Sequence, residues 1–152
     1  MKKIQWSKFS LIILATILLW LKTYIVYKTS FEIKIENWKQ ELILLLNPLS
    51  FLLFIFGIGL FLKERRQKHF LLISSFIISA VLFANVVFYR FFNDFLTIPV
   101  LFQASNMSDL GSSVNELLNW SDWIYFADFA ILVLIVFLKP AFAAYRPVSK
   151  MY

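Results

Sequence analysis

Four long apolar stretches dominate the 152-residue sequence, over 9–27, 42–62, 70–89 and 120–138. Each is about 20 residues long, which is the length that a helix rising about 1.5 Å per residue needs to cross a hydrocarbon core of about 30 Å. Hydrocarbon offers no partners to backbone N–H and C=O groups, so each stretch has to be helical. The sequence therefore predicts an all-α membrane protein in which residues 1–152 form one polytopic domain with four transmembrane helices.

The composition agrees with a lipid environment and excludes several classes of protein. Hydrophobic residues make up 61% of the chain, against about 45 to 50% in soluble domains. The net charge of +6 does not indicate a nucleic-acid partner, because the basic residues flank the apolar stretches and are not interleaved with exposed aromatic residues. The chain has no Cys, which excludes disulfides, thiolate metal sites and thiol nucleophiles.

The distribution of basic residues predicts how the chain lies in the membrane. Positive residues in short loops are retained in the cytoplasm. With the N-terminus inside, the cytoplasmic side holds ten of the 15 basic residues: Lys2, Lys3, Lys8, Lys63, Arg65, Arg66, Lys68, Lys139, Arg146 and Lys150. We therefore expect a multi-pass protein of the cell membrane with both termini cytoplasmic.

Polar residues inside the apolar stretches are the most informative, because they are unfavourable in hydrocarbon and tend to mark function or helix pairing. The four main ones are Lys22, Asn47, Asn85 and Asp128. Counted along the helices, all four lie roughly 6 to 12 Å below the outer interface. One interpretation is purely structural: Lys22 and Asp128 form an intramembrane charge pair, while Asn47 and Asn85 bond to neighbouring helices.

The alternative interpretation is that these residues, together with Arg90 and Asp94, form a polar recess in the outer leaflet for a lipid head group. The head-group candidates are then Arg90, Asp94, Asn85 and Asn47. The planar donors of Arg90 suit phosphate oxygens. Pro48 adds to this hypothesis, because a proline inside a helix leaves a backbone carbonyl without its partner.

The second outer loop, over 90–119, begins with an amphipathic and aromatic run and then becomes polar. We expect a short interfacial helix that ends before Pro99, followed by a flexible loop. No glycine-rich phosphate loop, nucleophile–base pair or metal-ligand cluster is present in the sequence. We therefore predict no catalytic residue, no metal ligand and no cofactor within this chain.

Several runs of sequence resemble the membrane domain of lipoteichoic acid synthases. They are Leu-Lys-Thr-Tyr at 21–24, the Asn-Pro run at 43–50 and, above all, Phe-Ala-Asn-Val-Val-Phe-Tyr-Arg-Phe-Phe-Asn-Asp-Phe-Leu-Thr at 83–97. The run at 120–128 is similar to the entry to that family's fourth helix. The resemblance covers most of the chain.

The resemblance implies a Gram-positive cell-envelope enzyme with five N-terminal transmembrane helices and an extracellular sulfatase-like domain. Such a domain uses a Thr nucleophile and manganese to move glycerol phosphate from phosphatidylglycerol onto a growing chain, leaving diacylglycerol. This sequence stops after four helices, so we expect a truncated membrane domain, without the catalytic domain that would be its partner, that is inactive alone. Its expected partners are membrane lipids, chiefly phosphatidylglycerol, and cell-envelope proteins. The alternative is a non-enzymatic four-helix membrane protein, either a small transporter or an accessory factor.

Overall fold

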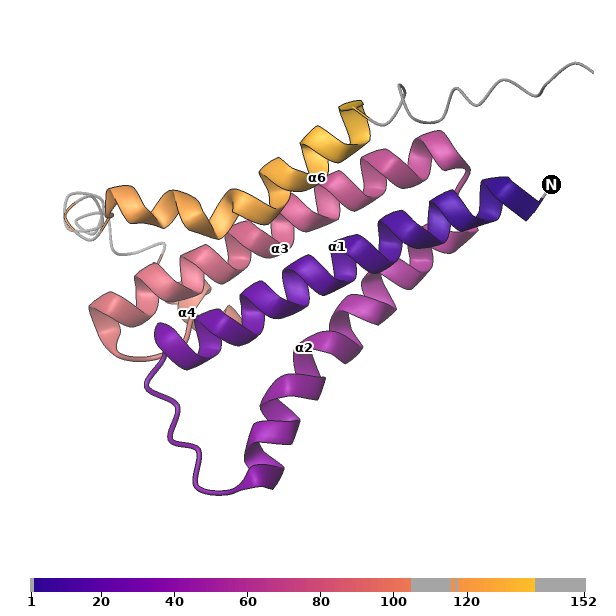
Figure 1. Cartoon of the computed structure of the whole chain (residues 1–152). Coiled ribbons are helices and arrows are strands. Elements are labelled where there is room, and N and C mark those ends of the chain that lie inside the picture. Colours follow the sequence, from indigo (N-terminus) through magenta and orange to yellow (C-terminus); the bar gives the residue numbers. More distant parts are fainter. Residues whose placement is uncertain (1, 105–115, 117, 139–152) are drawn as a thin grey trace, which may run out of the picture.

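The computed structural model of the chain describes residues 2–104, 116 and 118–138 (Figure 1). Its elements are α1 (Lys2–Thr29), α2 (Trp38–Ile58), η1 (Gly59–Phe61), α3 (Glu64–Phe92), α4 (Ile98–Ala104), η2 (Trp120–Phe126) and α6 (Ala127–Leu138), where η marks a 3₁₀ helix. Four described segments are helical, long and apolar enough to cross a membrane: Phe9–Thr29, Trp38–Phe61, Glu64–Phe92 and Trp120–Phe137. The described part of the chain contains no strand, and the predicted all-α membrane fold is confirmed.

Helices α1 and α3 form the centre of the bundle, because they pack against each other and each packs against α2 and α6, while α3 also packs against η2. The start of α1 and the turn between η1 and α3 lie at one end, which we call the hairpin end (Figure 1). Residues 30–37 and 93–104 lie at the other, which we call the loop end. Helices α1 and α2 are close together at the hairpin end and diverge toward the loop end (Figure 1).

The spacing of side chains on α1 explains its central position. Leu11, Ala15 and Leu19 follow one another every four residues and are buried against the other helices. Residues four apart lie on one face of a helix, so this face is the one that packs. Ile13 and Ile17 lie on another face and are exposed, which suits a surface that meets lipid rather than water.

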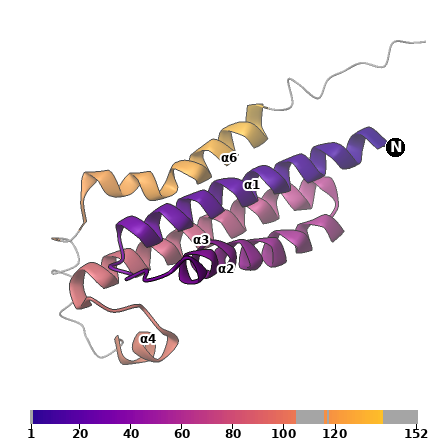
Figure 2. The same cartoon turned by 60° about the horizontal axis from the view of Figure 1, so that its bottom comes forward.

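The short helix of the second outer loop is present, but its predicted position is wrong. Helix α3 continues to Phe92 and ends where Asn93 adopts the left-handed conformation, with φ 55°. Asparagine tolerates this conformation better than most residues, so it serves as a helix stop. The short helix α4 begins after this stop, at Ile98, and places Pro99 in its first turn, where a missing N–H removes no helical hydrogen bond. Figure 2 shows α4 set apart from the long helices at the loop end.

The fourth membrane span begins as a 3₁₀ helix and not as an α-helix. Asn119 and Asp122 form a reciprocal cap at the start of η2: each side chain accepts a hydrogen bond from the backbone N–H of the other residue. Seven residues is long for a 3₁₀ helix, which rarely exceeds three or four. Contacts with neighbouring helices therefore have to hold η2, and they involve the predicted site residues.

Candidate functional site

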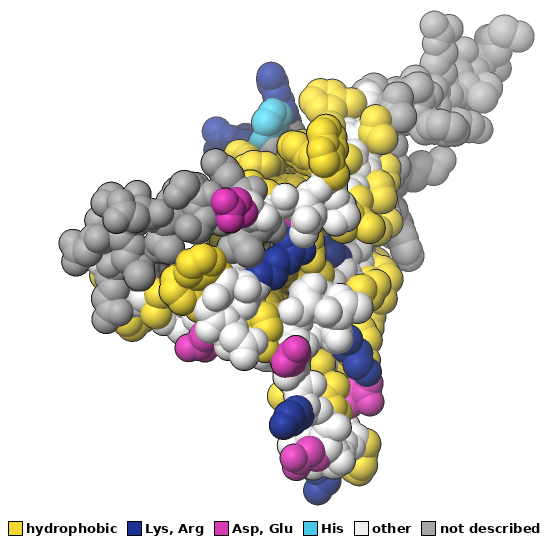
Figure 3. All heavy atoms as spheres, turned by 90° about the vertical axis from the view of Figure 1, so that its left-hand side faces the viewer, with side chains coloured by type: hydrophobic (Ala, Val, Ile, Leu, Met, Phe, Trp, Pro, Cys, Tyr) yellow, Lys and Arg dark blue, Asp and Glu magenta, His cyan; other side chains and the backbone are white. Residues whose placement is uncertain are grey.

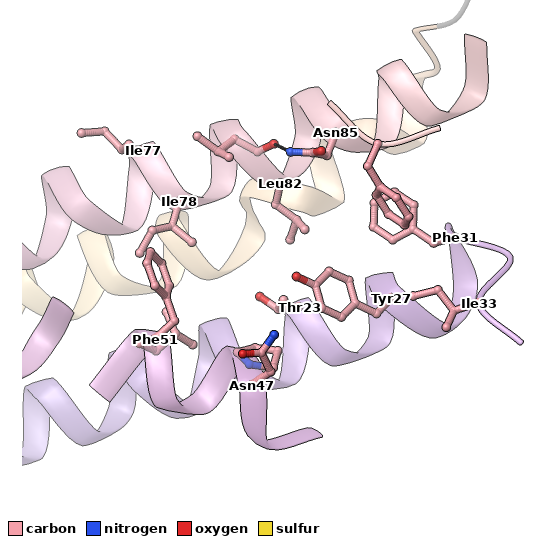
Figure 4. A pocket seen from close by; sticks show the side chains of 14 residues that line it. Thr23, Tyr27, Phe31, Ile33, Asn47, Phe51, Ile77, Ile78, Leu82 and Asn85 are labelled. Atoms are coloured by element: carbon pink, nitrogen blue, oxygen red, sulfur yellow. Dashed lines mark hydrogen bonds between the residues drawn. The ribbon is translucent and has the colours of Figure 1, made fainter. Parts of the chain in front are cut away.

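A cavity of about 590 Å³ lies between α1, α2 and α3 toward the loop end. Its walls are mostly apolar and include Phe51 from α2 and Ile78 and Leu82 from α3. Figure 4 shows these side chains surrounding an open space, with α1 and α2 on one side and α3 on the other. An apolar cavity of this size, set between membrane helices, is suited to a hydrocarbon chain.

Two polar groups on the cavity wall have no hydrogen-bond partner in the part of the chain that the structure describes. They are the side-chain amide of Asn47 and the hydroxyl of Tyr27, both of which line the cavity. Figure 4 shows both side chains directed into the space between the helices. Thr23 beside them is different, because its hydroxyl donates to the carbonyl of Leu19 at 2.7 Å. The cavity therefore offers Asn47 and Tyr27 to a bound molecule.

A second cavity of about 260 Å³ adjoins the first and leads to the loop end. The two cavities share three lining residues, Tyr27, Ile33 and Asn47. The second adds Lys34 and Gln40, which are polar and exposed. Together the two cavities form one recess, which we call the α1–α2 recess, with an inner part between the helices and a mouth that carries Lys34 and Gln40.

Aromatic packing closes the loop end of the larger cavity. Phe31 is only 3% exposed and lies between two rings, with its centroid 5.0 Å from that of Tyr89 and 4.9 Å from that of Phe95. Tyr89 also accepts a hydrogen bond from the backbone N–H of Glu32 at 3.2 Å. These contacts fix residues 30–33 against α3, so the recess opens between α1 and α2 rather than at its aromatic end.

Asn85 lines the same cavity but already has partners within the chain. Its Nδ2 donates to the carbonyl of Val81 at 2.9 Å, and its Oδ1 accepts from the backbone N–H of Leu96 at 3.1 Å. Asn85 thus ties the segment after α3 back to that helix, which differs from the helix-to-helix bond expected from the sequence. It leaves Asn47 as the asparagine available to a ligand.

Of the six residues in the predicted polar cluster, Asn47 and Asn85 line the recess and the other four do not. Arg90 forms a two-pronged ion pair with Asp122 of η2, with Nη1 to Oδ2 at 3.0 Å and Nη2 to Oδ1 at 2.8 Å. The Asp94 side chain accepts a hydrogen bond from the backbone N–H of Phe95 at 2.7 Å. Neither residue lines the α1–α2 recess, so the recess does not bring the whole predicted cluster together.

Lys22 and Asp128 form the other part of the cluster and lie against each other, with Nζ to Oδ1 at 2.6 Å. Their side chains are 11% and 6% exposed, which places the pair inside the bundle. Lys22 also donates to Ser79 Oγ and, at 3.0 Å, to the carbonyl of Tyr125. The ammonium therefore joins α1 to α3, η2 and α6, and it holds a carbonyl at the end of the 3₁₀ segment.

Residues 38–48 of α2 lean away from α1, and the proline inside α2 accounts for this change of direction. Pro48 cannot donate to the carbonyl of Leu44 and disturbs this turn of α2. The carbonyl of the next residue, Leu45, accepts a hydrogen bond from Trp20 Nε1 at 2.7 Å. Toward the loop end, Glu41 accepts from Lys28 at 2.6 Å. These bonds connect the diverging helices at two levels.

We expect Trp20→Phe to lower the free energy of unfolding by about 1 kcal/mol, because the indole N–H that donates to the Leu45 carbonyl is lost while an aromatic ring remains at this position. Thermal unfolding in detergent, followed by circular dichroism, measures this loss. Trp38→Phe is the matched control, because Trp38 is 70% exposed, and its effect should be close to zero. Equal losses in the two variants would show that the Trp20 bond does not stabilise the bundle.

Comparison with known proteins finds one protein family that matches nearly the whole chain. The model of the lipoteichoic acid synthase N-terminal domain family matches residues 1–151. The chain is 53% identical over 116 residues to lipoteichoic acid synthase-like YvgJ of Bacillus subtilis (strain 168), covering 76% of this chain and 19% of that protein.

Two further relatives are matched over nearly the full chain. Identity is 38% over 146 residues to lipoteichoic acid synthase 1 of Bacillus subtilis (strain 168) and 35% over 146 residues to lipoteichoic acid synthase of Staphylococcus aureus (strain USA300). Each match covers 96% of this chain and 23% of the relative. The chain thus spans about a fifth of the length of the curated relatives it matches. No solved structure matches it.

Proposed function

This chain belongs to the family of lipoteichoic acid synthase N-terminal domains, and from that premise we propose that it acts as the membrane domain of a phosphoglycerol transferase. The four helices anchor the enzyme in the membrane of a Gram-positive cell. The α1–α2 recess presents phosphatidylglycerol to a catalytic domain outside the membrane, which transfers its glycerol phosphate. The names of the relatives support lipoteichoic acid synthesis, whereas the donor lipid and the reaction are our proposal for this chain.

The single observation that carries the lipid-presenting role is the α1–α2 recess itself. It combines an inner part large enough for a hydrocarbon chain with a mouth that carries the ammonium of Lys34 and the amide of Gln40. A phospholipid likewise joins apolar chains to a charged head. A small transporter, the alternative from the sequence, is less supported, because Lys22 and Asp128 bind each other instead of facing a path for solute.

The proposal requires the loop end to face outward, as the distribution of basic residues predicts. The start of α1 and the basic run Lys63–Lys68 share the hairpin end, which then faces the cytoplasm (Figure 1). Figure 3 looks onto the loop end, where acidic and basic side chains are scattered together. A mixed surface of this kind is compatible with the outer side, since only an excess of basic residues opposes translocation.

The chemistry that this part of the chain supplies is confined to binding and orientation. Among the described residues, no three His, Cys, Asp or Glu side chains lie together as metal ligands would. No step of our proposal passes through the manganese ion that the family resemblance implies. The role of these helices is to hold the lipid so that its head group reaches the membrane surface.

The orientation predicts a labelling result. A Cys introduced at Ser112, in a chain with no Cys of its own, should react with a membrane-impermeant maleimide added to intact cells. A Cys introduced at Glu64, which is exposed at the hairpin end, should react only after the cells are opened. The reverse pattern would contradict the proposed orientation and with it the outward presentation of lipid.

The lipid-presenting role predicts that the purified chain retains phosphatidylglycerol in preference to phosphatidylcholine. Native mass spectrometry of protein released from micelles that contain equal amounts of the two lipids measures the retained ratio. We expect about fivefold more phosphatidylglycerol, because Lys34 places a positive charge at the mouth of the recess. Retention of neither lipid would contradict the proposed function.

A further inference from the structure

The α1–α2 recess has polar groups at two levels, and each level corresponds to a different part of a phospholipid. The inner level holds the Asn47 amide and the Tyr27 hydroxyl, neither of which has a hydrogen-bond partner in the described chain. Asn47 lies nine residues after Trp38 in α2, which corresponds to about 14 Å along the helix axis. Trp38 is an interfacial residue type, so Asn47 lies below the interface, where water is scarce.

An amide or hydroxyl without a hydrogen-bond partner is strongly unfavourable in hydrocarbon. Both groups are donors, so a carbonyl acceptor from a lipid satisfies them. Ester carbonyls are the first acceptors that a glycerophospholipid carries above its acyl chains. An acyl chain in the cavity beside Phe51 and Leu82 places such an ester beside Asn47 and Tyr27.

The outer level of the recess carries a positive charge. Lys34 lines the mouth together with Gln40 and forms no ion pair with any described residue. Glu32 and Glu36 flank Lys34 in the sequence. The backbone N–H of Glu32 donates to the Tyr89 hydroxyl, and that of Glu36 donates to Gln40 Oε1. An anionic phosphate is the group of a phospholipid that an unpaired ammonium at this level attracts.

We propose that the α1–α2 recess binds an ester-linked anionic glycerophospholipid, with one acyl chain in the larger cavity, an ester carbonyl at Asn47 and Tyr27, and the phosphate at Lys34. This inference rests on the proposed function and adds the parts of the lipid that are recognised. The contacts are to the ester and the phosphate, so the site selects for linkage and charge and not for the head-group alcohol.

Two competitions in one native mass spectrometry experiment test the two levels separately. In the first, the chain is offered equal amounts of ester-linked phosphatidylglycerol and its dialkyl ether analogue, which lacks the carbonyls. We expect about fivefold more of the ester lipid, which is the factor for one or two neutral hydrogen bonds. In the second, ester-linked phosphatidylglycerol competes with ester-linked phosphatidylcholine, as above.

Variants of the inner level should abolish the preference for the ester lipid while leaving the preference for charge. Tyr27→Phe and Asn47→Leu each remove a donor, and Tyr27→Phe also keeps the ring, so that a folding defect is not the cause. Ser50→Ala is the matched control, because its hydroxyl donates to the Leu46 carbonyl within α2 and lines neither cavity. Its ratio should equal that of the parent chain.

Variants of the outer level should have the opposite effect. Lys34→Gln should reduce the preference for phosphatidylglycerol over phosphatidylcholine by about fivefold, without changing the preference for ester over ether. Lys39→Gln is the matched control, because Lys39 is exposed and lines neither cavity. An equal reduction by the two variants would overturn the phosphate contact and leave only general attraction to the surface.

The possible outcomes separate this inference from the function on which it rests. If the parent chain retains phosphatidylglycerol but does not distinguish ester from ether, the ester contact is overturned and the proposed function stands. If the parent distinguishes them but Asn47→Leu and Tyr27→Phe do so equally well, the site lies elsewhere. If the parent retains no lipid, the proposed function fails as well.

Discussion

Replacing Asp128 with Asn is expected to lower the free energy of unfolding by about 3 kcal/mol. The Asp128 side chain is 6% exposed and accepts a hydrogen bond from Lys22 Nζ at 2.6 Å. Without the carboxylate, the lysine ammonium stays inside the bundle with no counter-charge, and its acceptors are then the neutral oxygens of Ser79, Tyr125 and the asparagine amide. Loss of one partner from a buried pair is far more destabilising than loss of both.

The double variant Lys22→Met with Asp128→Leu is therefore expected to recover most of the lost stability. Thermal unfolding in detergent, at one detergent concentration for all variants, measures the series. Glu41→Gln is the control, because the Lys28–Glu41 pair has the same 2.6 Å distance but side chains that are 41% and 45% exposed. Exposed pairs contribute about 1 kcal/mol or less. If Asp128→Asn is no more harmful than Glu41→Gln, the buried pair does not stabilise the bundle.

Asp122→Ala is expected to cost about 2 kcal/mol, the second largest effect. The carboxylate accepts two hydrogen bonds from Arg90, at 2.8 and 3.0 Å, and a third from the backbone N–H of Asn119 at 2.8 Å. The substitution removes both the link between α3 and η2 and one half of the cap that begins η2. Two separate stabilising contacts are lost at once.

A double-mutant cycle over Arg90→Ala, Asp122→Ala and the combination measures how much of this loss comes from the pair itself. The sequence indicates Arg90 as a candidate contact for a lipid head group, and a residue with that role alone would be dispensable for folding. The ion pair changes that expectation, and we now expect Arg90→Ala to reduce thermal stability. A coupling free energy near zero, with lipid retention reduced only in Arg90→Ala, would instead restore Arg90 as a lipid contact.

The features that the sequence predicted well are those that depend on length and on burial of charge. The length of an apolar run relates directly to the thickness of the hydrocarbon core, which is why the four spans were predictable. The contact between Lys22 and Asp128 also follows from one principle, because two lone charges at similar depth lower their free energy by pairing. Neither argument requires knowledge of how the helices are rotated.

The features that the sequence did not predict depend on that rotation. Counting residues placed Asn47 and Asn85 at similar depths and put Arg90 in the same head-group cluster, but it could not show that Arg90 pairs with Asp122 of η2 while Asn47 lines the recess. The pairing of Asp122 with Arg90 was not predicted, although the position of Asp122 near the start of the fourth span is a signal for it. The α-helix stop at Asn93 was missed because left-handed asparagine depends on local packing as well as residue type.

The most direct test of lipid binding in the α1–α2 recess is photo-crosslinking in nanodiscs with phosphatidylglycerol that carries a diazirine on one acyl chain. Mass spectrometry then locates the labelled residues. We predict about fivefold more label on Phe51 and Ile78, which line the recess, than on Leu134, which is exposed on α6, and we expect unlabelled phosphatidylglycerol to remove this excess. Equal labelling of the recess and of Leu134, unaffected by competitor, would contradict the presence of a lipid site between α1, α2 and α3.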